Sequence, residues 1–282
     1  MNAESILTLA GISCYVVASI MAITGLVHPS RFRDRWVLIL IVVGALSLFS
    51  VLATHAVFAD QLRAFTRFEA FTSYAIVVTA AYLILRVRRK LTGSLAAILV
   101  PYVTVVLVLG APVVRSEVSL SPKVESIWLG LHVIFAFSGY AFFSIAGVLA
   151  AAYLVQDHYL KRKRFSVWLE RLPALETLDR LMGVQVAVAF LLLTVAIVMG
   201  IMLVSLIGGG QEWITDPKII ATIAAWGIYA IVVQMRASAD RHGRRAAVVV
   251  LMGFFCLLFA FIGVHVVTDS VHGYLLVRGG GG

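Results

Sequence analysis

The sequence predicts an all-α fold, a polytopic membrane bundle of about eight transmembrane helices with both chain termini on the outer side. The first observation is composition: 61% of the 282 residues are hydrophobic, 13% are charged, and the mean hydropathy is +1.00. Soluble domains have roughly 45–50% apolar and about 25% charged residues. The second is that the apolar residues form long continuous runs, and lipid accepts only helices or closed barrels. The third is a one-sided distribution of basic residues.

Each predicted helix is an apolar run close to the length of about 20 residues that crosses a bilayer. The eight runs are roughly 6–28, 36–58, 69–86, 95–112, 128–155, 183–207, 219–235 and 246–267. The first lacks the basic leader of a signal peptide and continues to Val27, so we expect a retained helix. No stretch is typical of a separate soluble domain, so residues 1–282 are predicted to form a single integral membrane domain.

Basic residues fix the predicted orientation. Most of them follow the first, third, fifth and seventh runs, in clusters such as Arg86–Lys90 and Lys161–Arg164. The other connections and the C-terminal segment hold Arg63, Arg67, Arg115, Lys123, Lys218 and Arg278. The positive-inside rule places the larger set in the cytoplasm. The net charge of +9 therefore indicates membrane orientation and not nucleic-acid binding.

The longest cytoplasmic connection, about 156–182, combines this basic cluster with apolar residues from Trp168 to Leu178. We expect it to hold a short helix on the membrane surface. The cysteines, Cys14 and Cys256, lie within apolar runs and form no CxxC motif, so covalent haem attachment to this chain is not expected.

Four histidines fall near the outer membrane face in this topology: His55, His132, His265 and His272. A single histidine at a helix end is usually an interfacial polar residue, but four at one level favour a ligand role. Neutral imidazole is the commonest metal ligand and binds haem iron axially. Two histidines from different helices are able to hold one haem between them.

The outer loop from Gly208 to Lys218 is the second candidate. Asp216 suits a helix N-cap and Pro217 a first helical position, which explains the loop structurally. Trp213 then serves as an interface anchor. The same loop also suits a ligand site, with an apolar platform and Lys218 for anionic groups, and the two interpretations are compatible.

The order of these motifs resembles the cytochrome c assembly family, the CcsA/CcmC-like haem-handling membrane proteins, over about 128–275. The resembling segments are Leu131-His132-Val133 with Gly139-Tyr140-Ala141, Leu172–Leu178, Trp213, Asp216-Pro217-Lys218, Trp226 to Ala230, and His272-Gly273-Tyr274. A weaker match lies at His55 and at Phe68–Phe71.

The resemblance implies haem, as non-covalent haem b, held on the outer face by a tryptophan-rich segment and two axial histidines. By position, these ligands are His132 and His272. Trp213 and Trp226 are then expected to line the site, and Asp216 and Lys218 to shape its entrance. Tyr140 and His55 are further candidates, with His265 as an alternative ligand.

The family pattern is incomplete in this chain. Thr215, Ile219 and Ala221 replace a tryptophan, a glutamate and a tryptophan of the motif, and Gln234 replaces an inner histidine. These departures resemble the short HemX-like branch, which is tied to haem biosynthesis through the level of glutamyl-tRNA reductase. The alternatives are therefore a membrane regulator of that cytoplasmic enzyme, and a structural subunit of a membrane complex.

The leading hypothesis is a haem-binding protein of the bacterial cytoplasmic membrane that handles or presents haem for cytochrome c assembly or transport. We expect no catalytic side chain, although the chain is a candidate component of a haem-attachment machinery. Its partners are then haem, lipid and an external assembly protein. No apolar run carries a central charged residue, which disfavours an ion-driven transporter.

Overall fold

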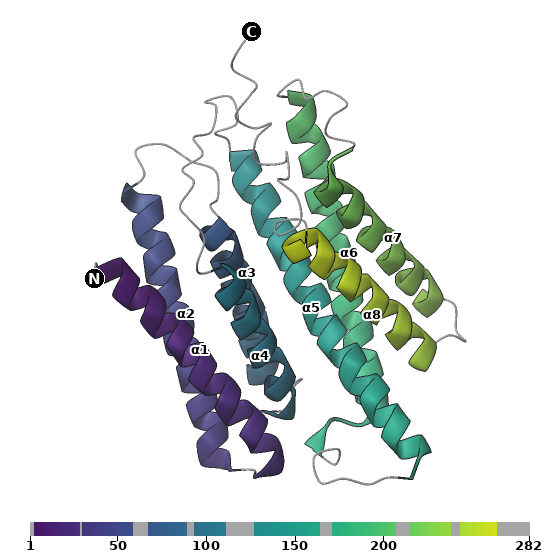
Figure 1. Cartoon of the computed structure of the whole chain (residues 1–282). Coiled ribbons are helices and arrows are strands. Elements are labelled where there is room, and N and C mark those ends of the chain that lie inside the picture. The colour runs from purple at the N-terminus through teal and green to yellow at the C-terminus, as the bar shows by residue number, and fades with distance from the viewer. Residues whose placement is uncertain are drawn as a thin grey trace. The chain divides into compact units, whose positions relative to one another are not determined.

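The helical membrane fold predicted from the sequence is confirmed. The computed structural model describes residues 3–28, 30–58, 67–88, 93–110, 127–163, 171–206, 215–237 and 243–263. Within these ranges, eight helices are long and apolar enough to cross a membrane. They are α1 (Ala3–Val27), α2 (Arg31–Phe58), α3 (Arg67–Val87), α4 (Gly93–Gly110), α5 (Ile127–Lys161), α6 (Leu175–Leu206), α7 (Pro217–Ala237) and α8 (Arg244–Leu258), the last continued by the π-helical turn η3 (Phe259–Gly263) (Figure 1).

Apolar side chains cover the outside of these helices. Leu46, Leu191 and Ile201 are 60%, 66% and 64% exposed. A helix that is apolar on its outer face as well as its inner one is typical of contact with lipid. The exposed residues therefore support the multi-pass membrane assignment made from composition.

The chain divides into two compact units. Unit 1 holds α1 to α4 with the end of α5 and the start of α6, and unit 2 holds the rest of α5 and α6 with α7, α8 and η3. The single domain predicted for residues 1–282 stays a prediction.

Small and hydroxyl side chains hold unit 1 together. At the crossing of α1 and α2, a Cβ on Gly11 would lie 3.2 Å from the Gly44 carbonyl oxygen and 2.8 Å from Leu48 Cγ. The Tyr15 hydroxyl shares a 2.7 Å hydrogen bond with Thr79 of α3. Glycine pairs of this kind let helix backbones approach closely, and buried hydroxyls then bridge the helices.

Aromatic packing holds unit 2 together. Phe143 of α5 stacks on Tyr229 of α7, with ring centroids 3.5 Å apart. A Cβ on Gly147 would lie 2.5 Å from the Phe254 ring, so α8 rests directly on the α5 backbone. These contacts fix which faces of α5, α7 and α8 point inward.

Two helices extend beyond their predicted apolar runs. α5 continues to Lys161, and α6 begins at Leu175 instead of near 183. Leu175 and Leu178 therefore form the first turn of α6 rather than a separate surface helix. Glu176 in that turn complements the positive end of the helix dipole, which favours the early start. Trp168 and Leu169 lie outside the described residues.

Candidate functional site

His132 is the predicted ligand that the structure describes most fully. It lies in the first turns of α5, and its Nδ1 is 2.8 Å from the Ala196 carbonyl oxygen of α6. A carbonyl oxygen only accepts hydrogen bonds, so Nδ1 carries the proton and donates it. In the neutral ring, Nε2 then keeps the lone pair that a metal requires. Backbone carbonyls commonly orient metal-binding histidines in this way.

Gly200, one turn beyond Ala196 on α6, makes room for this ring. A Cβ at Gly200 would lie 3.0 Å from His132 Cε1 and 3.3 Å from Nδ1. The imidazole therefore packs directly against the α6 backbone. The sequence analysis missed Gly200, and a single glycine in an apolar helix carries no signal that would reveal such a contact.

Lys218 and Asp216 lie at the start of α7. Asp216 is 2% exposed, and its Oδ1 accepts a 2.8 Å hydrogen bond from the Lys218 backbone nitrogen. Asp216 is thus the N-cap of α7, as its position before Pro217 indicates. The Lys218 side chain is close enough for its charge to act on His132. The structure therefore brings the lysine and the histidine to the same end of unit 2.

Trp226 and Tyr140 join helices at a deeper level of unit 2. The Trp226 indole donates a 2.9 Å hydrogen bond to Thr194 Oγ1 and stacks on Phe190, with ring centroids 5.4 Å apart. The Tyr140 hydroxyl is 3.0 Å from Thr222 Oγ1. Tyr140 lies about two helical turns from His132 along α5, and Trp226 lies as far from Lys218 along α7, about 12 Å in each case. Both side chains thus serve helix packing.

His55 belongs to unit 1 and has a different environment. Its Nε2 is 2.8 Å from Glu4 Oε1 of α1, and its Nδ1 is 2.9 Å from Glu69 Oε1 of α3. A ring that donates from both nitrogens to carboxylates has no lone pair for iron. In this arrangement His55 ties α1, α2 and α3 together, and a ligand role requires that it release one glutamate.

The two glutamates were not identified as partners from the sequence. Of the two, only Glu69 lies in a segment that the sequence singles out, the weak match at Phe68–Phe71. The one indication in the sequence that they could meet His55 is their membrane level, since both stand at the outer ends of helices in the predicted topology. His265, His272 and Trp213 lie outside the described residues.

Among the described residues, no group of three or more His, Cys, Asp or Glu side chains is arranged to hold a bare metal ion. A haem differs in this respect, because the porphyrin supplies four nitrogens and the protein adds only axial ligands. A single well-oriented imidazole beside a cationic side chain is therefore a donor set that fits haem.

These features define a multi-pass helical membrane protein with a histidine and a lysine at one end of its second unit. The chain belongs to the cytochrome c assembly protein family, whose pattern it matches over residues 39–272. That match starts well before the stretch from 128 on which the sequence resemblance rests.

Relatives named cytochrome c biogenesis protein CcsA are similar over much of the chain. The protein of Synechococcus sp. (strain RCC307) is 30% identical over 181 residues, which is 57% of this chain and 58% of the relative. The Guillardia theta protein is 26% identical over 220 residues, covering 72% and 73% of the two chains. The chain thus spans less than two thirds of the length of the Synechococcus relative. No solved structure matches it.

Proposed function

We propose that this chain binds haem at the outer face of the bacterial cytoplasmic membrane and presents it for cytochrome c assembly. His132 and His272 are the proposed axial ligands, and the haem is non-covalent haem b. The proposal rests on the family membership together with the geometry around His132.

The observation that carries the proposal is the hydrogen bond from His132 Nδ1 to the Ala196 carbonyl. It selects the tautomer with Nε2 available and holds the ring against Gly200. A ligand that is oriented before the iron arrives loses little freedom on binding, which raises affinity.

Lys218 supplies a positive charge for the propionate end of the haem. Haem propionates are anionic, and the Lys218 ammonium lies at the same end of unit 2 as His132. Asp216 fixes the start of α7 and with it the backbone of Lys218. Trp213 is proposed to lie against the apolar face of the haem, while Trp226 and Tyr140 support the site from below.

In this role the haem is cargo, and the chain supplies no acid or base. Attachment chemistry, in which cytochrome thiols add to haem vinyl groups, belongs to the haem and its acceptor. The contribution of this chain is to hold the iron and present the haem edge in a fixed orientation. An external assembly protein is the proposed partner that delivers the acceptor.

The absorption spectrum of the detergent-purified protein tests this proposal. Wild-type protein from haem-replete cells is expected to show sharp low-spin bands on reduction. His132→Ala is expected to lose them, and added imidazole to restore them in His132→Gly. The matched control is His158→Ala, which removes an exposed histidine near the other end of α5. Wild-type protein that neither carries nor takes up haem would exclude the proposed function.

One observation favours the HemX-like alternative, a membrane regulator of haem biosynthesis. Ala221, where the family motif has a tryptophan, is 8% exposed, and its carbonyl lies 3.6 Å from Cys256 Sγ of α8. Because Ala221 is buried, this position packs helices and does not extend an aromatic platform. On this alternative, the protein acts on a cytoplasmic enzyme through the basic connection at about 156–182.

A further inference from the structure

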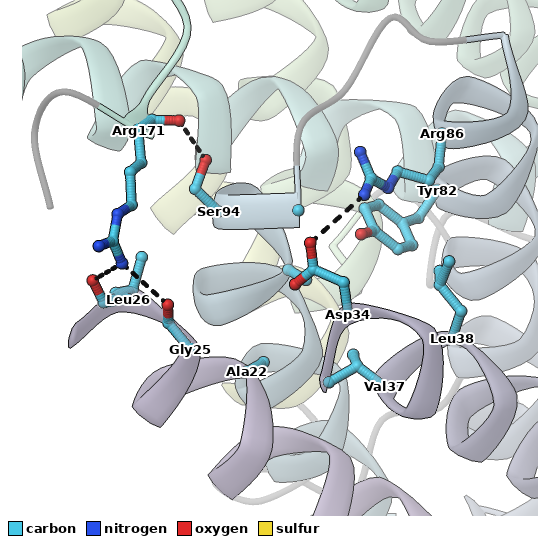
Figure 2. A pocket seen from close by; sticks show the side chains of 12 residues that line it. Ala22, Gly25, Leu26, Asp34, Val37, Leu38, Tyr82, Arg86, Ser94 and Arg171 are labelled. Carbon is cyan, nitrogen blue, oxygen red and sulfur yellow. Dashed lines mark hydrogen bonds and ion pairs between the residues drawn. The ribbon is translucent and has the colours of Figure 1, made fainter. Parts of the chain in front are cut away.

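Unit 1 contains a cavity of about 290 Å³ that the haem proposal does not use. Its apolar part is lined by Ala22, Val37, Leu38 and Ala96. Its polar part is formed by Asp34, Tyr82, Arg86, Ser94 and Arg171, which Figure 2 shows around one opening. The cavity thus combines an apolar interior with a charged rim, the pattern expected for an amphiphilic ligand.

Arg171 is held at the rim from both sides. Its guanidinium Nη1 donates to the carbonyls of Gly25, at 3.1 Å, and Leu26, at the end of α1 (Figure 2). Its own carbonyl accepts a 2.8 Å hydrogen bond from Ser94 Oγ. Nε and Nη2 make no hydrogen bond to any described residue. The contacts that fix Arg171 are all uncharged, so its positive charge is not neutralised by them.

Arg86 stands across the same rim, on the side of Asp34 (Figure 2). Its Nη2 is 3.9 Å from Asp34 Oδ2, beyond hydrogen-bond length. Gly93 keeps the space between them open, because a Cβ there would lie 2.9 Å from Asp34 Oδ2 and 3.2 Å from Arg86 Nη2. The described residues that line the cavity thus include two arginines and one aspartate.

We propose that this cavity binds the phosphate head group of an anionic membrane phospholipid, independently of the haem function. The phosphate lies between Arg86 and Arg171. The Asp34 carboxylate and Ser94 Oγ accept hydrogen bonds from head-group hydroxyls, since the Ser94 proton is donated to the Arg171 carbonyl. Guanidinium groups match phosphate oxygens in a forked geometry. Basic pockets between helices on the cytoplasmic side bind acidic lipids, and the sequence places this end of unit 1 on that side.

The size of the cavity favours a head group over a whole ligand. Pockets that enclose drug-sized molecules have volumes of about 300–1,000 Å³. A cavity of about 290 Å³ lies just below that range. It therefore suits a phosphoglycerol group whose acyl chains stay along the lipid-facing surface.

Native mass spectrometry of the full chain tests the proposal. The protein is equilibrated in micelles with equal amounts of phosphatidylglycerol, phosphatidylethanolamine and phosphatidylcholine, and the retained lipid is identified. Wild-type protein is expected to keep one phosphatidylglycerol. Arg86→Gln is expected to lower its occupancy about fivefold, the effect of one basic side chain near a lipid phosphate. Gly93→Ala is also expected to lower it, because the added methyl group would crowd Asp34 and Arg86.

Arg88→Gln is the matched control, since it removes an exposed arginine two residues from Arg86 that does not line the cavity. It is expected to retain lipid as wild type does. Equal retention of the three lipids by wild-type protein, or equal occupancy in Arg86→Gln and Arg88→Gln, would overturn the proposal. Displacement of the lipid by millimolar inorganic phosphate would also overturn it, because the site would then bind free phosphate.

Discussion

Gly200→Ala offers the sharpest test of how His132 is oriented. The added methyl group would lie 3.0 Å from His132 Cε1 and 3.3 Å from Nδ1, closer than ordinary van der Waals contact. The ring must therefore move by a few tenths of an ångström away from α6. That movement lengthens the 2.8 Å bond to Ala196, which fixes both the tautomer and the direction of Nε2.

The size of the effect has two bounds. Loss of one hydrogen bond to a neutral carbonyl costs about 1 kcal/mol, or about fivefold in affinity. Changes in groups that orient metal ligands cost about 10–100-fold. We therefore expect Gly200→Ala to weaken haem affinity by a factor between these two values. Helix propensity at position 200 improves by about 1 kcal/mol at the same time. A variant that folds as well as wild type and binds haem less tightly is the predicted result.

The assay is haem titration of the purified protein, followed by absorption, beside thermal unfolding. Gly227→Ala is the matched control, because a Cβ there meets nothing within 4 Å and the gain in helix propensity is the same. Unchanged affinity in Gly200→Ala, together with lost binding in His132→Ala, would refute the orientation argument. Unchanged affinity in both variants would exclude His132 as a ligand.

Three further predictions concern other parts of the chain. Glu69→Gln removes a charged partner of His55, and the Glu69 side chain is only 10% exposed. We expect the unfolding free energy to fall by about 1–3 kcal/mol, measured by thermal unfolding. An unchanged midpoint would show that the contact is not stabilising. Trp226→Phe keeps the stack on Phe190 but loses the hydrogen bond to Thr194, so we expect a loss of about 1 kcal/mol with haem binding retained; lost haem would instead indicate direct contact. Replacing Lys161, Arg162 and Lys163 with glutamine should leave the haem spectrum intact, and a changed level of glutamyl-tRNA reductase in cells would support the regulatory alternative over haem presentation.

Local sequence determined the class of this protein and the approximate place of each helix. An apolar run of sufficient length enters lipid as a helix whatever its neighbours are, because its backbone satisfies its own hydrogen bonds. The N-cap at Asp216 was predictable for the same reason, since a cap depends on residues next to each other in the chain. The ends of α5 and α6 were less predictable, because helices continue into polar sequence past the apolar core.

The tertiary structure decided what the functional candidates contact. In a helix that is apolar on all sides, the sequence does not specify which face meets which neighbour. Only packing aligns His132 with Ala196, 64 residues away, or places both nitrogens of His55 against Glu4 and Glu69. Likewise, Arg171 meets the end of α1 across 146 residues. Contacts of this kind depend on helix rotation and depth, which are set by glycine-sized gaps and buried hydroxyls distributed over several helices.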